Sequence, residues 1–389
     1  MKNIYLLFFV LLFSNVYSQL YQIGHTTITF VDSSRNNRNI ATEIYYPANT
    51  TGNNVPITTL NSLQFPSLVF GHGFVMTWDA YYNFKDFLVP NGYIMAFPKT
   101  EGSLSPSHIE FARDLAFVIN QMNVLGTLSS SIFYNRVSQM NAVMGHSMGG
   151  GASFLAVPLN ANIKTLVNFA PAETTPSAIT AAASITIPSL IFAGGNDCVT
   201  PSGTNQLPMY SNLVSLCKTY INIIGGSHCQ MANSNTFCNF GEVTCSPSPT
   251  ITRSIQHTKI FNYLLPWLDF QLKSNCSQGA TFDSQLLVDT SITYQKNCVQ
   301  CETLQNNGFA MPETEMVLFP NPASDFISIK GIFKKDCIIK IMDVNSKIVC
   351  LQKITDGSIV DVSKFISGVY FYQIVDADNQ INKGKFVKK

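Results

Sequence analysis

The chain has 389 residues, of which 46% are hydrophobic and 12% are charged, and 24 basic against 23 acidic side chains leave a net charge of +1. This composition provides a substantial core and excludes a disordered chain. Without a basic surplus the chain lacks the electrostatic footprint of a nucleic-acid-binding protein, so no nucleic-acid partner is expected. Its length fits one large domain and one small domain.

Residues 1–18 are predicted to be a secretory signal peptide. Lys2 precedes an apolar run from Ile4 to Phe13, and Val16-Tyr17-Ser18 approximates a cleavage site. The run is shorter than the ~20 residues that a transmembrane helix needs, which favours export over membrane insertion. Export would also allow the ten cysteines to pair.

Residues 19–272 are predicted to form an α/β domain. Stretches with helical spacing, such as Trp78–Leu88, His108–Met122 and Thr252–Leu272, alternate with short apolar runs. Because most runs are apolar on both faces, we expect a mostly parallel eight-stranded sheet flanked by helices. The predicted strands are His25–Val31, Asn39–Tyr46, Ser67–Phe70, Tyr93–Phe97, Gln139–Met144, Ile163–Phe169, Ser189–Ala193 and Thr219–Ile224.

The composition changes after residue 272. Residues 273–316 are polar and carry Cys276, Cys298 and Cys301, which indicates a linker with local cross-links. Residues 317–389 hold short alternating runs separated by turn residues and are predicted to form a small, β-sandwich-like domain. Its strands are expected at Phe326–Lys330, Ile338–Asp343, Lys347–Leu351 and Val369–Ile374.

The segment Gly145-His146-Ser147-Met148-Gly149 joins a predicted strand to a helix that begins near Gly150. A serine at such a turn presents its hydroxyl at the carboxyl edge of a parallel sheet, and the flanking glycines provide the room that the turn requires. Ser147 is therefore the candidate nucleophile.

A serine nucleophile needs a base and an acid that orients the base. Of the six histidines, His228 follows the last predicted strand, where the base of a Ser…Asp…His order is expected. Asp197 follows the seventh strand and is the predicted acid, and Glu173, after the sixth strand, is the alternative. The predicted triad is Ser147, Asp197 and His228.

An oxyanion hole requires backbone N–H groups, one of them from the residue after the nucleophile. That residue is Met148, and the second donor is expected from Phe74 in the loop "FGHGF". His72 and His146, which lie beside these two donors, are candidate substrate contacts. Trp78 is a further candidate, with a packing role in its helix as the alternative.

These motifs resemble those of a known family. Residues 20–272 resemble an α/β-hydrolase of the cutinase and PET-hydrolase-like group, in the neighbourhood of dienelactone hydrolases and chlorophyllases. The matching pieces are "GHGF" at 71–74, "GHSMGGG" at 145–151, "IPSLIFAGGNDCVTP" at 187–201 and "GGSHC" at 225–229. The resemblance implies hydrolysis of carboxylic esters through an acyl-enzyme on Ser147, Asp197 and His228, with Phe74 and Met148 as oxyanion donors and part of an apolar wall. It also implies that no cofactor or metal is needed, and we expect a monomer.

Two departures bear on the substrate. Polyester-cleaving members of the family usually carry a tryptophan in the loop after the sixth strand, whereas this loop reads "APAETTPSA". The region from Pro171 to Pro188 is too short for a lid domain, which favours access for bulky or polymeric esters. A peptidase or acyltransferase on the same triad, and a surface binding protein without turnover, remain alternatives.

The C-terminal domain resembles the sorting domain of type IX secretion cargo. The resemblance is carried by "LFPNPASDFISI" at 318–329, "GVYFYQI" at 368–374 and the terminal "KGKFVKK". It implies recognition by the type IX secretion machinery and release to the outer cell surface or the medium. A carbohydrate-binding role is the alternative.

Three disulfides are expected from the predicted topology. Loops at one edge of the sheet favour Cys198–Cys229, and the opposite edge favours Cys217–Cys276. The short segment "CNFGEVTC" favours Cys238–Cys245. Cys298 and Cys301 lack the context of a redox or zinc site and are expected to cross-link locally.

Overall fold

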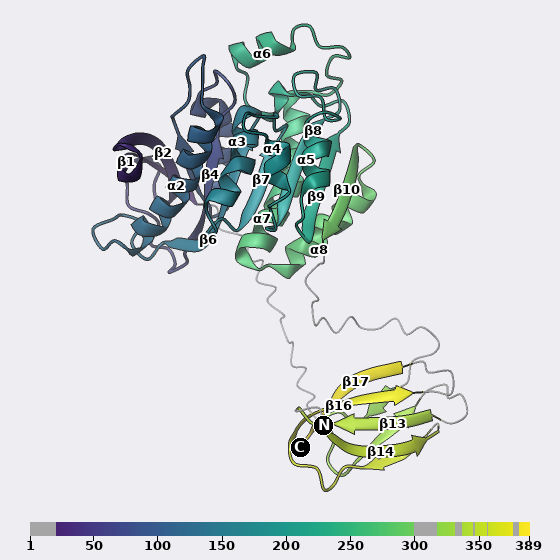
Figure 1. The fold of residues 1–389 in the computed structure, drawn as a ribbon. Helices are drawn as coiled ribbons and strands as arrows, with labels where there is room; N and C mark the ends of the chain where they lie inside the picture. Colours follow the sequence, from purple (N-terminus) through teal and green to yellow (C-terminus); the bar gives the residue numbers. More distant parts are fainter. Residues whose placement is uncertain (1–20, 299–316, 331–336, 345–346, 356, 376–380) are drawn as a thin grey trace, which may run out of the picture. The chain divides into compact units, whose positions relative to one another are not determined.

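The computed structural model describes residues 21–298, 317–330, 337–344, 347–355, 357–375 and 381–389. The predicted signal peptide and Cys301 lie outside these residues. The chain divides into two compact units, residues 1–301 and residues 302–389, and each is described by itself (Figure 1).

A ten-stranded sheet forms the centre of the first unit, with the strand order β10-β9-β8-β7-β6-β4-β5-β2-β1-β3. The strands from β4 to β9 pair in parallel, and β1, β2 and β10 join them in antiparallel pairs. The strands are β1 (Gln22–Asp32), β2 (Arg38–Ala48), β3 (Gly52–Asn53), β4 (Phe65–Gly71), β5 (Ile94–Pro98), β6 (Val137–His146), β7 (Thr165–Phe169), β8 (Ser189–Gly194), β9 (Cys217–Ile223) and β10 (Ile292–Cys298).

The predicted α/β-hydrolase fold is confirmed, and each of the eight predicted strands has its counterpart in the sheet. The sheet has two strands more than predicted. The first is β3, which has two residues. The second is β10, which pairs antiparallel with β9 along its whole length.

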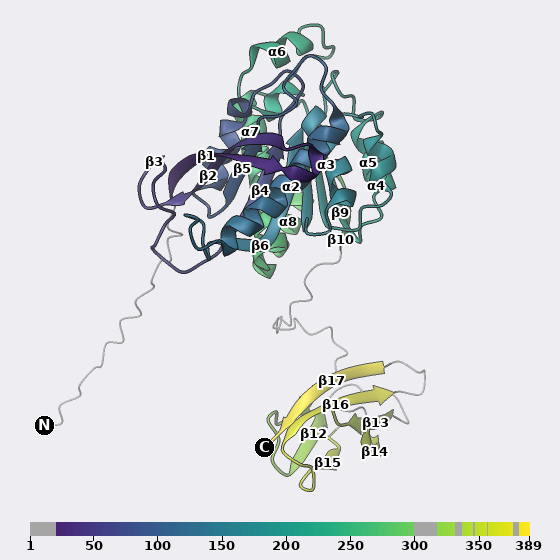
Figure 2. The same ribbon diagram turned by 60° about the vertical axis from the view of Figure 1, so that its left-hand side comes forward.

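Helices cover both faces of the sheet (Figures 1 and 2). One face carries α2 (His108–Thr127), α3 (Met148–Ala156), α4 (Ala178–Ala182) and α5 (Gln206–Asn212), and the other carries α1 (Tyr82–Leu88), α7 (Arg253–Lys273) and α8 (Cys276–Val288). The predicted helix Trp78–Leu88 consists of a 3₁₀ turn, η2 (Trp78–Tyr81), followed by α1. No helix among the described residues is long and apolar enough to cross a membrane.

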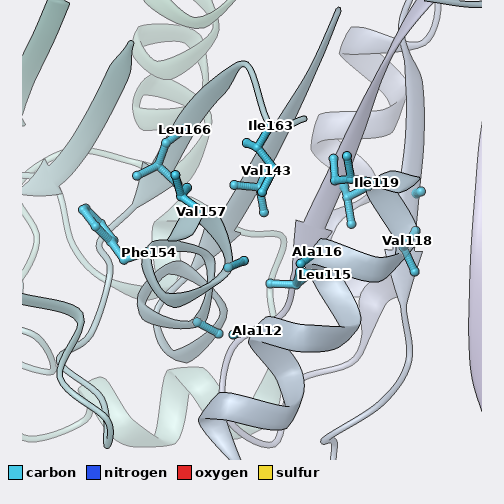
Figure 3. Packing of buried hydrophobic residues seen from close by; sticks show 14 of the residues in the cluster. Ala112, Leu115, Ala116, Val118, Ile119, Val143, Phe154, Val157, Ile163 and Leu166 are labelled. Carbon is cyan, nitrogen blue, oxygen red and sulfur yellow. The ribbon is translucent and has the colours of Figure 1, made fainter. Parts of the chain in front are cut away.

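Two hydrophobic clusters lie on the two sides of the sheet, because successive side chains of a strand point to opposite faces. In β6, Val143 belongs to the cluster under α2 and α3, whereas its neighbours Ala142 and Met144 belong to the cluster under α1 and α7. Figure 3 shows Val143 among side chains of α2 and α3, including Leu115 and Phe154. Burial on both faces fixes the central strands firmly and so fixes the loops that leave their ends.

The prediction of a linker at residues 273–316 is wrong for residues 276–298. These residues form α8 and β10, and β10 is the edge strand of the main sheet. Phe282 and Leu286 of α8 pack under α7 in the buried core. The sequence does not show β10 because it has no apolar run: only Ile292 of its seven residues is buried, as an exposed edge strand allows.

The second unit holds two antiparallel sheets, as predicted for a small all-β domain. One has the order β11-β12-β15 and the other β14-β13-β16-β17, and their side chains form a separate core that includes Ile327, Ile339 and Phe386. The strands are β11 (Val317–Phe319), β12 (Phe326–Lys330), β13 (Cys337–Met342), β14 (Ile348–Ile354), β15 (Ile359–Asp361), β16 (Gly368–Val375) and β17 (Ile381–Lys388).

Candidate active site

Ser147 lies between the end of β6 and the start of α3, at the carboxyl edge of the parallel strands. Its backbone has φ 54° and ψ −122°. A non-glycine residue with this conformation carries ~1–3 kcal/mol of strain, which the surrounding structure must hold in place. The strained turn between a strand and a helix is the geometry that presents a nucleophilic hydroxyl in this fold.

Glycines around the turn allow two loops and a helix to meet. A Cβ on Gly145 would lie 2.3 Å from the carbonyl oxygen of Gly149, and a Cβ on Gly149 would lie 2.2 Å from the carbonyl group of Gly71. Gly71 ends β4 and pairs with Gly145 of β6. The close packing therefore places the loop after β4 directly beside the turn that carries Ser147.

Asp197 and His228 lie in the loops that follow β8 and β9, which are neighbours in the sheet. The Asp197 Oδ2 atom and the His228 Nδ1 atom are 2.9 Å apart, and the side chains are 0% and 3% exposed. Because a carboxylate only accepts, the imidazole donates its Nδ1–H to Asp197. In the neutral ring, this leaves Nε2 without a proton and able to accept one from a hydroxyl.

The Asp197 carboxylate is held by its own turn as well as by His228. Oδ1 accepts the backbone N–H groups of Val199 and Thr200, at 2.9 and 2.8 Å, and Oδ2 accepts the Thr200 hydroxyl at 2.8 Å. Thr200 Oγ1 also lies 3.0 Å from His228 Nδ1. Thr200 was not among the predicted site residues. The spacing Asp-x-x-Thr is a signal that could have identified it, because it is typical of an aspartate that closes a turn with its side chain.

Glu173, the alternative acid, has a different role. Its carboxylate accepts the backbone N–H of Ile179 in the first turn of α4, at 3.0 Å. An acidic side chain there satisfies a helix N–H group that has no partner within the helix. The structure therefore brings Asp197, and not Glu173, to His228.

Of the two predicted oxyanion donors, Met148 directly follows Ser147, and Phe74 belongs to the loop after β4, whose start packs against Gly149. Met148 is the first residue of α3, where backbone N–H groups have no partner within the helix, and Phe74 follows β4. The Phe74 side chain is 46% exposed, whereas the Met148 side chain is buried. Phe74 can thus form part of an apolar wall, but Met148 offers substrate only its backbone.

His72 and His146 were expected to contact substrate, and the structure contradicts both expectations. His72 is 3% exposed, and its ring nitrogens lie 2.9 Å from the carbonyl oxygens of Gly73 and Thr100. His146 is 0% exposed and is bonded through both ring nitrogens. Their side chains are turned inward, where interior polar groups face both ring nitrogens of each histidine.

Trp78 follows the Phe74 loop and is the first residue of η2. It packs against Tyr82 and Tyr45, at ring-centroid distances of 5.3 and 6.2 Å. With Tyr21 these rings line a surface cavity of about 680 Å³ between the first strands and α1. Trp78 thus both packs against neighbouring rings and lines this cavity.

The three predicted disulfides are wrong in their pairing. The structure has Cys198–Cys245, Cys229–Cys238 and Cys217–Cys298, and Cys276 is also disulfide-bonded but not to Cys217. The prediction linked the acid and base loops directly, whereas each loop is linked instead to the segment around α6 (Thr236–Glu242). Cys298 was assigned to a linker, but it lies opposite Cys217 in the β9–β10 pair.

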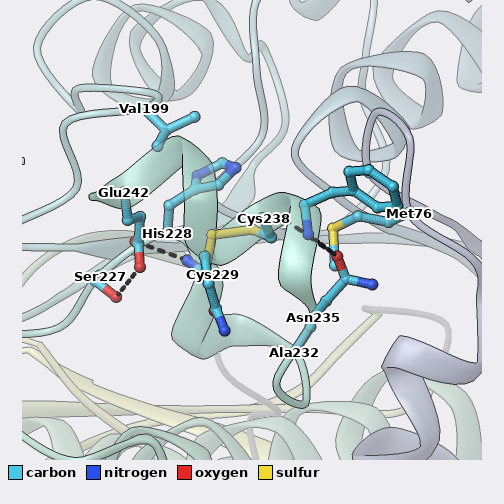
Figure 4. Close-up of a disulfide and its surroundings, with 12 residues drawn as sticks. Met76, Val199, Ser227, His228, Cys229, Ala232, Asn235, Cys238 and Glu242 are labelled. Atoms are coloured by element: carbon cyan, nitrogen blue, oxygen red, sulfur yellow. Dashed lines mark hydrogen bonds between the residues drawn. A yellow bond between two sulfur atoms is a disulfide. The ribbon is translucent and has the colours of Figure 1, made fainter. Parts of the chain in front are cut away.

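The α6 segment is fixed against the base loop by hydrogen bonds as well (Figure 4). Glu242 accepts the Cys229 N–H at 2.8 Å and the Ser227 hydroxyl at 3.2 Å. The hydrophobic side chains of Phe237, Phe240 and Val243 in this segment are 67%, 79% and 75% exposed. The segment therefore presents exposed apolar side chains and is cross-linked and hydrogen-bonded to the loop that carries His228.

Among the described residues, no three His, Cys, Asp or Glu side chains are grouped as ligands of a metal ion.

The first unit matches a known family. Residues 20–246, more than half of the chain, match a family model described as PET hydrolase-like. The chain belongs to the PET hydrolase-like family. The matched residues include Ser147, Asp197 and His228 and the whole of α6, and they end before α7.

Two cutinases are similar to part of this PET hydrolase-like chain. Cutinase 1 of Thermobifida cellulosilytica is 30% identical over 118 residues, which cover 30% of this chain and 43% of that protein. A cutinase of Thermobifida fusca (strain YX) is 30% identical over 118 residues, covering 30% of this chain and 37% of that protein. The chain thus spans less than half of the length of these curated relatives.

The second unit has its own match. Residues 317–389 match a secretion system C-terminal sorting domain, which confirms the predicted resemblance. A PET hydrolase-like unit joined to a sorting domain is an exported protein. It is secreted or held at the outer cell surface, as predicted.

Proposed function

We propose that this protein is a serine esterase that hydrolyses carboxylic esters through an acyl-enzyme, with Ser147, His228 and Asp197 as its triad. The observation that carries the proposal is the 2.9 Å contact of Asp197 and His228 at the same sheet edge as the strained Ser147. This contact leaves the base in the tautomer that accepts a proton from a hydroxyl.

In the first half of the reaction, the Ser147 oxygen attacks the ester carbonyl carbon while its proton passes to His228 Nε2. The carbonyl π-electrons move to oxygen, and the N–H groups of Phe74 and Met148 stabilise the negative charge that forms there. Asp197 stabilises the imidazolium through its Nδ1–H. The carbonyl then re-forms, the bond to the alcohol oxygen breaks, and His228 returns its proton to the departing alkoxide.

In the second half, water repeats the sequence of steps. His228 takes a proton from the water molecule as the water oxygen attacks the acyl carbon. The bond to Ser147 breaks, and the proton on His228 goes to the Ser147 oxygen. The carboxylic acid leaves, and the enzyme returns to its starting state without a cofactor.

The surface near the site favours apolar, uncharged esters. Phe74 and Val199 are 46% and 41% exposed, and the exposed Phe237, Phe240 and Val243 lie on the nearby α6 segment. Only the short α4 lies between β7 and β8, so this region contains no lid domain. The cutinases among the relatives support a polymeric ester as one substrate class.

The test is hydrolysis of p-nitrophenyl butyrate by the wild-type chain and by Ser147→Ala. Loss of the nucleophile should lower turnover by ~10⁴-fold or more. Ser153→Ala is the matched control, because Ser153 is a buried serine of the adjacent helix α3. Hydrolysis that survives Ser147→Ala would refute the mechanism.

The same preparation separates the alternative functions. A peptidase would cleave a p-nitroanilide at a rate comparable to the ester, and an acyltransferase would form a new ester from an added alcohol faster than free acid. A binding protein without turnover would hydrolyse none of these substrates.

For the second unit, we propose that residues 317–389 are recognised by a type IX secretion machinery. Support comes from the match to a sorting domain over the whole unit. Expression with and without these residues in a host with this machinery tests the proposal. Equal amounts of both forms outside the cell would refute it.

A further inference from the structure

His146 is a buried, titratable group beside the nucleophile that the mechanism above does not use. Its Nδ1 atom lies 3.0 Å from the Tyr81 hydroxyl, and its Nε2 atom lies 3.1 Å from the backbone carbonyl oxygen of His228. Its ring also packs on the His228 ring, with centroids 4.6 Å apart. One side chain thus contacts both the backbone and the ring of the proposed base.

The direction of each hydrogen bond follows from the groups involved. A carbonyl oxygen only accepts, so Nε2 of His146 carries the proton and Nδ1 accepts from the Tyr81 hydroxyl. The Tyr81 oxygen in turn accepts the backbone N–H of Gly73 at 2.7 Å. Met76 Sδ lies 3.2 Å from the same hydroxyl, but a thioether sulfur is a weaker acceptor than an imidazole nitrogen.

Burial keeps His146 in this state. Loss of solvation lowers the pKa of the ring well below its ordinary value, so the neutral form persists. The neutral ring has one donor and one acceptor, and both are used. The result is a continuous chain of hydrogen bonds from the Gly73 N–H through Tyr81 and His146 to the His228 carbonyl oxygen.

These hydrogen bonds join two loops and the end of β6, which come from distant parts of the sequence. Gly73 precedes Phe74 in the loop after β4, His146 precedes Ser147, and His228 lies in the loop after β9. The proposed oxyanion donor, nucleophile and base therefore all adjoin one hydrogen-bonded path. If one link is removed, a buried polar group is left without its partner, and loops that must be placed to a fraction of an ångström are released.

We propose that His146 and Tyr81 are positioning residues that hold the oxyanion loop and the base loop in register with Ser147. The inference rests on the proposed esterase function. It gives His146 a role in catalysis without contact with substrate.

The first test is Tyr81→Phe, which keeps the ring and removes only the hydroxyl. Activity on p-nitrophenyl butyrate is measured per active site, with the sites counted by titration with diethyl p-nitrophenyl phosphate. We expect kcat to fall about 10- to 100-fold while KM changes less than about 3-fold. The matched control is Tyr93→Phe, because Tyr93 is also fully buried and donates to a side chain, Asp269, at 2.7 Å.

The second test replaces His146. Gln supplies an NH₂ donor group and an acceptor oxygen, whereas Leu supplies neither, so His146→Gln should keep about ten times more activity per site than His146→Leu. The double variant Tyr81→Phe/His146→Leu should be about as impaired as the less active of the two single variants, because both changes break the same chain of hydrogen bonds.

The outcomes are distinguishable. A wild-type chain that neither reacts with the phosphate nor hydrolyses the ester refutes the proposed function itself. Three results overturn the positioning role in an active enzyme: Tyr81→Phe with wild-type kcat per site, an equal loss in Tyr93→Phe, or losses that multiply in the double variant. If Tyr81→Phe does not fold, the contrast between His146→Gln and His146→Leu decides alone.

Discussion

Replacing Asp197 by asparagine should reverse the polarity of the contact with His228. Oδ1 of Asp197 accepts two backbone N–H groups, from Val199 and Thr200, so the amide oxygen of asparagine must stay in that position. The amide NH₂ group then occupies the place of Oδ2, 2.9 Å from His228 Nδ1. Because this group donates, the Nδ1 atom of His228 would accept from it, and the imidazole would carry its proton on Nε2 instead.

The expected loss follows from this change of tautomer. With a proton on Nε2, the imidazole cannot accept the proton of Ser147, and the imidazolium loses the carboxylate that stabilises it. Such a change costs a factor of ~10⁴ in turnover, about 5.5 kcal/mol at 25 °C. The backbone bonds of the turn are kept, so the variant should remain folded.

The assay is the initial rate of p-nitrophenyl butyrate hydrolysis at pH 7 to 8, with thermal unfolding as the check on folding. Glu173→Gln is the matched control, because glutamine can still accept the Ile179 N–H at the start of α4, and we expect less than about a 3-fold change in rate. A large loss in Glu173→Gln with near-normal activity in Asp197→Asn would refute the assignment of the acid.

Three further predictions test other parts of the structure. Burial lowers the pKa of His146 from 6.5, so the unfolded chain binds the extra proton below pH 6.5. The free energy of unfolding should therefore fall on acidification by up to ~1.4 kcal/mol per pH unit. Denaturation curves at pH 7.5 and 5.5 should show a smaller fall for His146→Gln than for the wild-type chain. An equal fall in both would contradict burial of a neutral ring. Gly149→Ala would place a Cβ 2.2 Å from backbone atoms of Gly71 and should abolish esterase activity. Gly203→Ala is the control and should leave the activity unchanged, because nothing lies within 4 Å of its Cβ. Equal activities of the two variants would show that the turn is not tightly packed. Removing the Cys198–Cys245 disulfide, which spans 47 residues, should cost ~4 kcal/mol of unfolding free energy in urea denaturation, and a cost below ~1 kcal/mol would show that the loops are fixed without it.

The central sheet and the candidate triad were predictable for one physical reason. Parallel strands buried on both faces are continuous apolar runs, and the loops after them meet at one edge of the sheet. Once Ser147 was placed after β6, the loops after β8 and β9 were the places to search for Asp197 and His228. The structure then adds Thr200, whose contact with the acid depends on the turn geometry.

The features that the sequence did not show depend on contacts between distant segments. β10 is mostly exposed and holds no apolar run, and it is recognised only by its pairing with β9, so residues 273–298 read as a linker. The burial of His146 depends on Tyr81, which is 65 residues away in the chain. The disulfide pairing depends on where α6 lies, and nothing in the local pattern around Cys238 shows this.

The cross-links at α6 have a consequence for when such an enzyme can work. Cys198 directly follows the acid and Cys229 directly follows the base, and each is tied to the segment that carries α6. In a reducing cytosol these ties would be absent, and the two loops would have only non-covalent restraints. We therefore expect the proposed esterase to hydrolyse esters poorly until the newly made chain reaches an oxidising compartment, where these two disulfides can form.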